Sequence, residues 1–322
     1  MTFSRITGTG GYLPERVMHN KEFEKLFDTS DEWIRERTGI KRRHVAADEE
    51  TTSDMGLAAA RKAIDAAHVS VSDIDLIIVA TTTPDKVFPS TACIVQRRLK
   101  LATIPAFDIH AACSGFIYAL DVADRFIRTG GATHALVIGS ETFSRIIDWS
   151  DRGTCVLFGD GAGAIVLTAA DEPGIMSTHI HSDGAFEEAL HVPAGISSGY
   201  DSIRSKSAFI QMKGHEVFKK AVGTLGSIAR ETLSANNVHK NDISWLIPHQ
   251  ANLRIIVAAA KKLDLPMERV VVTVDEHANT SSASIPLALD VAIRDGRIKR
   301  GELLLFEAFG AGFTWGSALV RY

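Results

Sequence analysis

The sequence is poor in cysteine and has neither a long apolar run nor a metal-binding motif. Its 322 residues hold only three cysteines, too few for a disulfide framework, and no C-x-x-C or H-E-x-x-H pattern, so we expect free thiols and no metal or cofactor. The chain lacks a run of about 18 apolar residues and a basic segment leading into an apolar one, so we expect no membrane span and no secretory signal. These absences predict a cytoplasmic protein.

An excess of charge of one sign is also lacking. The chain has 35 Lys and Arg against 39 Asp and Glu, a formal net charge of -4, so bulk charge does not predict binding to nucleic acid or to an anionic membrane. What the chain does have is apolar residues, at 45%, which are enough for a large core. Its length suggests two domains or one duplicated domain.

Repeated segments favour duplication. A-L-D-V-A at 119–123 recurs at 288–292, an offset of 169, and Asp-Ile at 73–74 recurs at 242–243 with the same offset. G-A-I-V-L at 163–167 matches G-S-A-L-V at 316–320 with an offset of 153, which predicts an insertion in the first copy around 143–155. Because each copy alternates amphipathic helices with apolar strands, we predict two α/β halves, 1–171 and 172–322, packed as an α-β-α-β-α sandwich.

Cys113 is a candidate nucleophile. It follows an apolar strand predicted at 104–109 and precedes a helix whose apolar residues recur at spacings of three and four from Phe116 to Ile127. Unpaired N–H groups and the dipole at the start of a helix favour a thiolate, so we expect a reactive thiol. The alternative is a buried structural cysteine, a common fate of free Cys.

His249 and Asn279 are candidate partners of this thiol. They follow apolar stretches predicted as strands at 243–247 and 270–274, and each precedes a predicted helix. Alone, a His or Asn in such a place is more often a core or capping residue. The repeat maps Cys113 onto Ser282 and His249 onto Ala80, so each candidate comes from one half only. Since equivalent edges of two halves meet near their twofold axis, we predict that the three side chains face one cavity.

Two other features have plainer interpretations. His110 precedes a helix start, which favours a core or capping residue over a catalyst. The glycine-rich segment F-G-D-G-A-G-A at 158–164 opens no predicted helix, so we interpret it as a tight hairpin with close backbone packing. A hydride-transfer enzyme is disfavoured because no G-x-G-x-x-G follows a strand and opens a helix.

The motifs resemble those of the thiolase-like condensing enzymes, and most closely the β-ketoacyl-(acyl-carrier-protein) synthase III family. The resemblance covers nearly the whole chain and implies a five-layered thiolase-like fold. It is carried by T-S-D-E-W-I at 29–34, R-T-G-I at 37–40, F-P-S-T-A-C at 88–93, D-I-H-A-A-C-S-G-F at 108–116, F-G-D-G-A-G-A at 158–164, P-H-Q-A-N-L-R-I-I at 248–256, A-N-T-S-S-A-S at 278–284 and F-G-A-G-F-T-W-G-S-A-L-V at 309–320.

The resemblance implies an initiating step of type II fatty acid synthesis. Cys113 would take the acyl group of acetyl-CoA or a similar acyl-CoA, and malonyl-acyl carrier protein would then lose CO2 and condense with it to give β-ketoacyl-acyl carrier protein. His249 and Asn279 would stabilise the enolate, while the backbone N–H groups of Cys113 and Ala311 would hold the oxyanion of the acyl group. The two thioesters are substrates, and no cofactor is implied.

The resemblance also implies binding residues. Trp33 and Arg152 would sandwich the CoA adenine and Arg37 would meet phosphate, although Trp33 could instead be a surface residue of a capped helix. Phe88 would close the acyl pocket of a second subunit in a homodimer. The remaining predicted CoA and substrate contacts are Thr29, Leu157, Phe158, Met212, Gly214, Phe218, Ala251, Asn252 and Phe309. The predicted carrier-protein contacts, which a solvated basic face would also explain, are Arg254, Lys261 and Lys262.

Three positions depart from the family pattern. Ala278 and Ala311 stand where relatives often have Gly, and His215 replaces a frequent Asn. The two alanines fit the family's backbone if their φ angles are negative. Alternatives are a relative that uses another acyl-CoA in secondary metabolism, one that transfers acyl groups without condensation, and a silent partner subunit. The presence of Cys113 disfavours the last.

Overall fold

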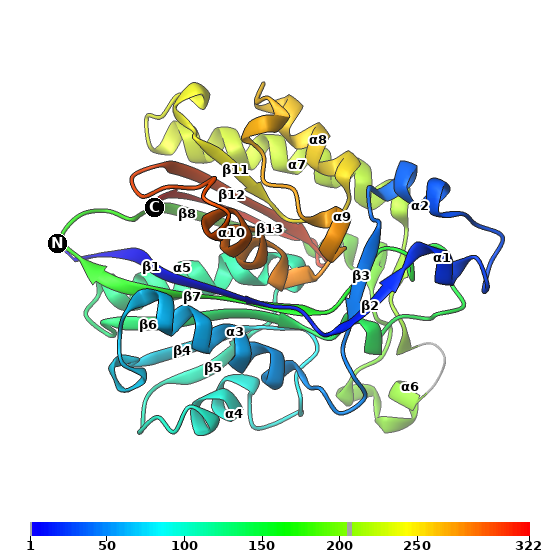
Figure 1. Ribbon diagram of the computed structural model, residues 1–322, viewed down its shortest axis with the longest axis horizontal. Coiled ribbons are helices and arrows are strands. Elements are labelled where there is room, and N and C mark those ends of the chain that lie inside the picture. The colour runs from blue at the N-terminus through cyan, green and yellow to red at the C-terminus, as the bar shows by residue number, and fades with distance from the viewer. Residues whose placement is uncertain (1, 205–207) are drawn as a thin grey trace.

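The computed structural model describes residues 2–204 and 208–322 and contains two large β-sheets (Figure 1). The first has the order β1-β7-β6-β4-β5 and the second the order β11-β12-β13-β8. The strands of the first sheet are β1 Phe3–Tyr12, β4 Leu76–Ala80, β5 Ala106–Ile109, β6 His134–Glu141 and β7 Gly161–Ala170. Those of the second are β8 Ile175–Ser182, β11 Trp245–Pro248, β12 Leu303–Gly310 and β13 Thr314–Arg321.

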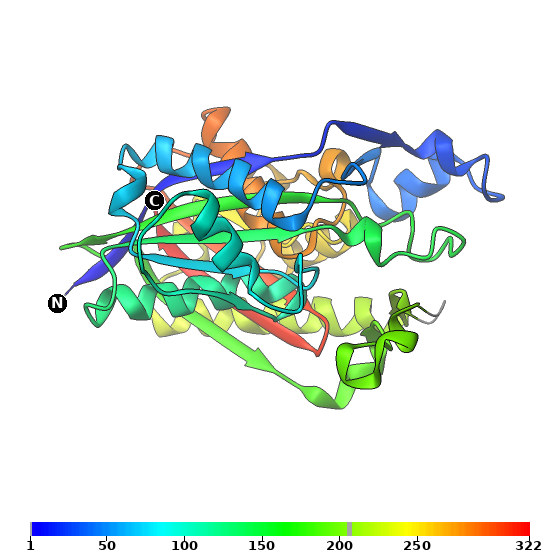
Figure 2. The same ribbon diagram turned by 90° about the horizontal axis from the view of Figure 1, so that it is seen from below.

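Helices form three layers around these sheets. Two lie between the sheets: α5 contacts β4 and β6 of the first and β8 and β13 of the second, and α10 contacts β1, β7 and β11. Helices α3 and α4 cover the outer face of the first sheet, and α7 and α8 cover that of the second (Figures 1 and 2). The predicted five-layered α-β-α-β-α fold is therefore confirmed. The helices are α3 Thr52–Ala67, α4 Thr91–Arg98, α5 Gly115–Arg128, α7 Gly214–Ala235, α8 Leu253–Lys262 and α10 Ser284–Arg294.

The two sheets are copies of one plan. Four elements of the first half begin 169 residues before their counterparts: β4 before β11, the 3-10 turn η2 (Ala112–Ser114) before η9 (Ser281–Ala283), α5 before α10, and β6 before β12. The offset falls to 153 between β7 and β13, so the extra residues of the first copy lie in the connection 142–160. The chain passes from one sheet to the other between Ala170 and Ile175; the division at residue 171 stays a prediction.

Two local predictions were wrong. Residues 270–274 form a single bridge between Val270 and Leu246 instead of a strand, and Val274 begins the short helix α9 (Val274–His277). The backbone N–H groups of Thr273 and Val274 donate to the Gln250 side chain, which removes them from a strand ladder. The glycine-rich segment is not a tight hairpin, because the long connection 142–160 separates β6 from β7. It does pack closely: a Cβ at Gly163 would lie 2.6 Å from the Leu287 backbone N.

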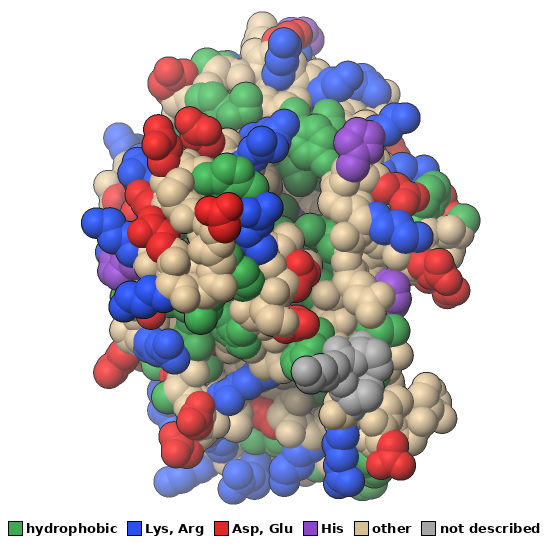
Figure 3. Space-filling model, turned by 90° about the vertical axis from the view of Figure 1, so that its right-hand side faces the viewer, with side chains coloured by type: hydrophobic (Ala, Val, Ile, Leu, Met, Phe, Trp, Pro, Cys, Tyr) green, Lys and Arg blue, Asp and Glu red, His purple; other side chains and the backbone are tan. Residues whose placement is uncertain are grey.

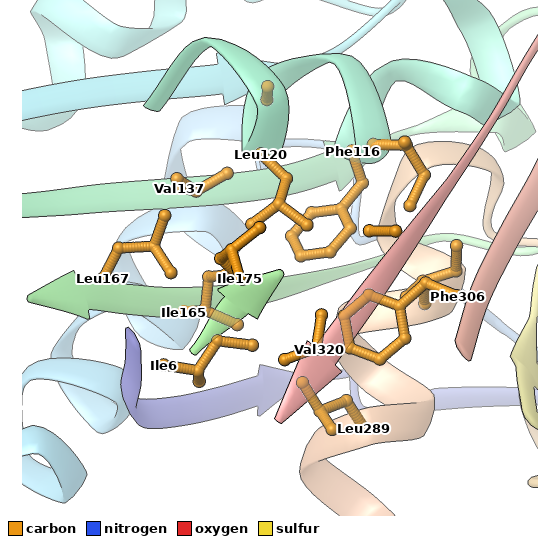
Figure 4. Packing of buried hydrophobic residues seen from close by; sticks show 14 of the residues in the cluster. Ile6, Phe116, Leu120, Val137, Ile165, Leu167, Ile175, Leu289, Phe306 and Val320 are labelled. Atoms are coloured by element: carbon orange, nitrogen blue, oxygen red, sulfur yellow. The ribbon is translucent and has the colours of Figure 1, made fainter. Parts of the chain in front are cut away.

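The main core fills the space between the sheets. Phe116 and Leu120 of α5 meet Ile165 of β7, Leu289 of α10 and Phe306 of β12, and all are fully buried (Figure 4). Truncating one of these large side chains to Ala costs on the order of 3–5 kcal/mol in a well-packed core. Since Phe116 is three residues from Cys113, the same packing fixes the start of α5.

Figure 1 shows the smaller strands β2 and β3 and the helices α1, α2 and α6 at the end of the molecule toward which β4 and β6 run. None of the helices in the described part of the chain is both long and apolar enough to cross a membrane. The smaller strands and α-helices are β2 Arg16–His19, α1 Asn20–Phe23, α2 Asp31–Thr38, β3 Arg42–Val45, β9 Leu190–His191, α6 Tyr200–Arg204 and β10 Gln211–Met212. The remaining 3-10 turns are η1 Val71–Asp73, η3 Phe143–Arg145, η4 Gly184–Ala189, η5 Ile196–Ser198, η7 Lys240–Asp242 and η8 Met267–Arg269.

Candidate active site

Cys113 lies in the turn η2, directly before α5. The turn is set by Ala112, whose φ of +45° is rare for a residue with a side chain. The hydroxyl of Thr314 donates to Ala111 O at 3.0 Å, and that of Ser114 donates to Thr314 O at 2.9 Å, so the β12–β13 connection holds the turn in place. Gly310 forms the adjacent wall, because a Cβ there would lie 2.7 Å from the backbone N of Cys113.

The thiol itself is buried, and this overturns the prediction of an easily formed thiolate. Burial raises the pKa of Cys113 to about 12, although a hydrogen bond with the Ser281 hydroxyl and one from the backbone both lower it. The nearby carboxylate of Glu141 raises it further. Desolvation therefore outweighs the helix start, and Cys113 is a thiol at neutral pH.

His249 follows β11, and its backbone N–H donates to Glu307 O at 2.7 Å. The side chain of the next residue, Gln250, is buried and donates to Pro248 O and Val271 O. The side-chain oxygen Oε1 of Gln250 accepts from the backbone N–H groups of Thr273 and Val274 at the start of α9. Gln250 therefore fixes the loop that carries the imidazole. Burial lowers the pKa of His249 to about 3, which keeps the ring neutral at pH 7.

Asn279 is held in a short parallel pairing with the connection 142–160. Its backbone N–H donates to Leu157 O and its carbonyl accepts from Gly159 N–H, both at 3.0 Å. The side-chain Oδ1 accepts the backbone N–H of Ser281 at 2.9 Å. With Oδ1 engaged in this way, Nδ2 is the end of the amide that can donate to a ligand.

The structure places the three segments that carry the candidate residues next to one another. Cys113 lies against Gly310 of β12, and its turn η2 contacts the turn η9, which follows Asn279. The same strand binds the backbone of His249. Ala311, the predicted second oxyanion donor, follows Gly310, and its carbonyl accepts from the Thr314 hydroxyl that also binds Ala111. A buried thiol from the first half of the repeat is thus combined with a neutral imidazole and an oriented amide from the second.

Family models and known relatives show which family the chain belongs to. The model of 3-oxoacyl-[acyl-carrier-protein (ACP)] synthase III matches residues 107–184, and that of its C-terminal part matches 233–322. Over 322 residues, which are 100% of both chains, the protein is 65% identical to β-ketoacyl-[acyl-carrier-protein] synthase III of Thioalkalivibrio sulfidiphilus. The relative of the same name in Alkalilimnicola ehrlichii is 62% identical over 323 residues, again 100% of both chains.

A solved structure extends the agreement to three dimensions. The crystal structure of 3-oxoacyl-[acyl-carrier-protein] synthase III from Aquifex aeolicus matches with a TM-score of 0.93 at 50% identity, covering 99% of this chain and 100% of that one. The chain belongs to the β-ketoacyl-[acyl-carrier-protein] synthase III family. It is therefore an acyltransferase, the condensing enzyme that starts fatty acid synthesis.

The predicted adenine sandwich of the family is closed in this structure. The guanidinium carbon of Arg152 lies 4.9 Å from the centre of the Trp33 ring, and that of Arg37 lies 5.7 Å from it. Arg152 also donates to Asp28 O at 2.7 Å. Because Arg152 stacks directly on the indole, a base can enter between them only if the guanidinium moves away.

The other predicted substrate contacts of the family fall into two groups around the site. Leu157 and Phe158 join Trp33 in one apolar cluster, whereas Phe309 packs on Phe313 in another. Asn252 is the N-cap of α8, where its side chain accepts from Arg254 N–H and donates to Arg37 O. The remaining residues are Thr29, which is partly buried before α2; Met212 of β10, which pairs with Leu190 of β9; Gly214 and Phe218, on α7; and Ala251, between β11 and α8.

Predicted protein-binding residues of the family are exposed. Arg254 and Lys261 lie on the outer face of α8, and Lys262 is exposed beside them. The Arg254 guanidinium rests over the ring of Phe218 at 5.4 Å, which holds part of the long side chain in place. Phe88 is 82% exposed, on the loop before α4.

The departures from the family pattern differ in outcome. Ala311 is not among the residues with positive φ and meets the condition of a negative angle, but Ala278, with φ of +58° and ψ of −162°, does not. Its N–H also closes α9 on Val274 O, so it is occupied. His215 is exposed on α7. His110 is exposed too and caps no helix, so the core or capping interpretation was wrong.

Several residues around the site were missed from sequence. Gln250, Glu141 and Ser281 are buried and bind the three candidate residues or their supporting loops. Arg43 is fully buried, donates to Val156 O, and so supports the segment that pairs with Asn279. The sequence around Glu141 and Arg43 does not indicate these supporting contacts, because their partners lie far along the chain.

Proposed function

We propose that Cys113, His249 and Asn279 carry out the two half-reactions of acyl-CoA and malonyl-acyl carrier protein condensation. These roles are supported by the burial of all three residues on neighbouring segments, the neutral imidazole of His249 and the oriented amide of Asn279. In the first half-reaction the sulfur of Cys113 attacks the acyl-CoA carbonyl, the carbonyl–sulfur bond of CoA breaks, and an acyl-Cys113 forms. The N–H groups of Cys113 and Ala311 would hold the transient oxyanion.

In the second half-reaction, malonyl-acyl carrier protein loses CO2 and leaves a thioester enolate. A neutral His249 donates a hydrogen bond to the enolate oxygen, and Asn279 Nδ2 donates a second. The pKa of about 3 suits this role, because an imidazolium would protonate the enolate before it attacked acyl-Cys113. Decarboxylation supplies the carbanion, so the proposed chemistry uses no metal or cofactor, and its CoA and carrier-protein thioesters suit a cytoplasmic enzyme.

The direct test is intact-protein mass spectrometry with a panel of acyl-CoAs, followed by malonyl-acyl carrier protein. We expect an acyl adduct on Cys113 that disappears as β-ketoacyl-acyl carrier protein forms. Cys113→Ala should give neither, whereas His249→Ala and Asn279→Ala should acquire the adduct and fail to discharge it. An unaffected product yield in Cys113→Ala would contradict the mechanism. Discharge only to a hydroxyl or amine acceptor would instead support an acyltransferase of secondary metabolism.

We propose that the exposed basic face of α8 docks the carrier protein. Arg254 and Lys261 lie on this face, and Lys262 lies beside it. Because the whole chain has a formal net charge of -4, an acidic partner would be attracted only by a local basic patch of this kind. The end of the molecule that carries α1, α2 and α6 is hollowed in Figure 3, with basic side chains beside the depression. Arg254→Glu should raise KM for malonyl-acyl carrier protein and leave that for acyl-CoA unchanged. Arg61→Glu, an exposed change on α3, should alter neither.

We also propose a homodimer formed along β5. This strand is the edge of the first sheet, its four residues are only partly buried, and Val87 and Phe88 are 58% and 82% exposed nearby. A second copy would pair the edge and cover the apolar loop. Sedimentation should give a dimer for the native chain and a monomer for Phe88→Asp. A native monomer would contradict the proposal.

A further inference from the structure

A buried carboxyl group joins the two halves of the chain beside the candidate site. Glu141, the last residue of β6 in the first half, is fully buried and has no part in the proposed half-reactions. Its Oε1 is hydrogen-bonded to the hydroxyls of Ser281 at 3.2 Å and Ser282 at 3.0 Å, both of which belong to η9 in the second half. Its Oε2 binds groups of the first half that directly follow β4, namely the hydroxyls of Thr81, Thr82 and Thr83 and the N–H of Thr82.

The strand that carries this carboxyl group is also the surface on which η9 rests. Gly139 precedes Glu141 by two residues, so both point to the same side of β6. A Cβ at Gly139 would lie 2.3 Å from Ser282 O and 3.1 Å from Ala283 N, so the turn packs directly on the strand backbone. The Ser282 hydroxyl also lies 2.8 Å from Ala80 O at the end of β4. The first sheet therefore fixes where η9 lies.

Ser281 passes this placement on to Asn279. Its backbone N–H donates to Asn279 Oδ1 at 2.9 Å, which orients the amide so that Nδ2 is the end that can donate to a ligand. The backbone at Ser281 has φ of +50°, a conformation that a residue with a side chain keeps only when its surroundings hold it. The bond between its hydroxyl and Glu141 is one such hold. A displaced η9 would therefore turn the Asn279 amide.

The turn of Cys113 has different supports. The hydroxyls of Thr314 and Ser114 bind it to the β12–β13 connection. Among the described residues, the hydrogen bonds of Glu141 go to the segment after β4 and to η9, and none goes to η2. Loss of the Glu141 side chain should therefore disturb Asn279 more than Cys113.

We propose that Glu141 is a positioning residue that sets Asn279 for the decarboxylation of malonyl-acyl carrier protein. Its carboxyl group ties η9 of the second half to the segment after β4 of the first. The N–H of Ser281 then carries that position to the amide that binds the enolate. The inference rests on the proposed function, because that function assigns Asn279 to the second half-reaction. Glu141 acts through η9 and not on the substrates themselves.

This role depends on the shape of the carboxyl group and not on its charge. Thr82 N–H can only donate, so Oε2 must accept there, whereas each hydroxyl can rotate to donate or to accept. An amide with its oxygen toward Thr82 and its NH2 group toward the two serines would meet the same partners. Glu141→Gln should therefore keep η9 in place, whereas Glu141→Ala removes all of these bonds.

Separate rates for the two half-reactions test the proposal. CoA release from acetyl-CoA measures acylation, and CO2 release from malonyl-acyl carrier protein by the acetylated protein measures decarboxylation. In Glu141→Ala, CO2 release should slow on the order of 10²-fold, as for a displaced catalytic group, while CoA release stays close to the native rate. Glu141→Gln should release CO2 at least about tenfold faster than Glu141→Ala. Equal slowing of both half-reactions, or equal rates of CO2 release in the two variants, would overturn the proposal.

A serine variant keeps the test open if Glu141→Ala fails to fold. The double change Ser281→Ala/Ser282→Ala removes both partners of Oε1 but keeps the Ser281 N–H that binds Asn279. It should slow CO2 release more than CoA release, because η9 is no longer tied to the first half. Native rates of both half-reactions in this variant would refute the positioning role.

Asp290→Ala is the matched control. Asp290 is also a buried carboxyl group that joins the halves, because it lies on α10 and accepts from the Thr9 hydroxyl of β1 at 2.8 Å. Its loss should leave the ratio of the two rates at the native value, whereas a selective loss of CO2 release would overturn the special role of Glu141. A native acetyl adduct with equal slowing in Glu141→Ala rejects the positioning role alone, whereas the lack of a native adduct rejects the proposed function.

Discussion

The turns that carry Cys113 and Ser282 have the same backbone but different surroundings. Each is a 3-10 turn that opens with a residue of positive φ, Ala112 at +45° and Ser281 at +50°, and runs into a helix of the middle layer. Each packs on the strand end of the opposite half, η2 on β12 and η9 on β6. At these equivalent strand ends stand Gly310 beside Cys113 and Glu141 beside Ser282.

This difference teaches how a duplicated fold comes to hold one active site. Gly310 has no side chain, so its backbone packs directly against Cys113, where a Cβ would lie 2.7 Å from the backbone N. Glu141 fills the corresponding place with a carboxylate that binds both serines. The second turn thereby becomes a support for the first. The repeat supplies the turn geometry twice, and the residue at the facing strand end makes the surroundings of the two copies different.

Exchanging the side chains of Cys113 and Ser282 between the two turns should have the largest effect on activity. In Cys113→Ser/Ser282→Cys the thiol would lie where the Ser282 hydroxyl now binds Ala80 O at 2.8 Å and Glu141, away from the oxyanion donors. We expect condensation to fall by at least ~10⁴-fold, as when a nucleophile is deleted. Mass spectrometry after incubation with acetyl-CoA should show no adduct at position 282. An adduct there would mean that the two turns are chemically equivalent.

The strands behind the turns differ in a second way that pH should expose. Glu141 has many donors, but both carboxyl oxygens of Glu307 on β12 are buried without a hydrogen-bond partner among the described residues, and burial raises the pKa of Glu307 to about 8. The pKa of Glu307 is near 4.5 in the unfolded chain and about 8 in the folded one. Between pH 4.5 and pH 8 the folded state therefore holds a proton that the unfolded state has lost, so the free energy of unfolding falls as the pH rises.

Glu307→Gln should remove this fall in the free energy of unfolding with rising pH. Relative to the native chain, its free energy of unfolding should rise by about 1.4 kcal/mol per pH unit across this window, roughly 5 kcal/mol in total. Urea titrations at several pH values measure the difference, in which the contributions of His249 and other groups cancel. The exposed change Glu268→Gln is the control and should give a flat difference. A flat difference for Glu307→Gln as well would show that its carboxyl is charged when folded.

Filling the space beside Cys113 should make the first turn resemble the second. In Gly310→Ala the new methyl group would overlap the Cys113 backbone N, at 2.7 Å, and Cβ, at 3.0 Å. Displacing the turn from its oxyanion donors should lower the rate of CoA release on the order of 10²-fold. Gly184→Ala, which meets only open space, should keep the native rate. Normal acylation in Gly310→Ala would show that this wall does not limit the site.

Substituting Ala278, the residue before Asn279, should give the smallest effect of these changes. Ala278 adopts φ of +58° and ψ of −162°, a region largely restricted to glycine, whereas its counterpart Ile109 is in a regular strand. Ala278→Gly should therefore stabilise the fold by about 1 kcal/mol in chemical denaturation. Ala283→Gly, where φ is −76°, should destabilise it by about 0.5–1 kcal/mol. The same sign for both would contradict the strain at Ala278.

Sequence alone could predict the duplicated plan and the turn of Cys113, because both depend on local apolar periodicity and on an internal offset. It could not predict the thiol pKa, since burial of Cys113 depends on β12, far along the chain. Residues 270–274 look like a strand, but periodicity cannot show that Gln250 takes their N–H groups. The contact between Trp33 and Arg152, and the burial of Arg43, likewise join distant segments whose meeting no short motif records.

The wall that Gly310 provides also orders events during synthesis. Cys113 is translated long before β12, so a growing chain exposes this cysteine until the second half folds against the first. In that interval the thiol lacks the burial that raises its pKa in the folded protein, and it is open to oxidation or to metal capture. Completion of the second half therefore buries the cysteine and brings β12 against its turn in a single event.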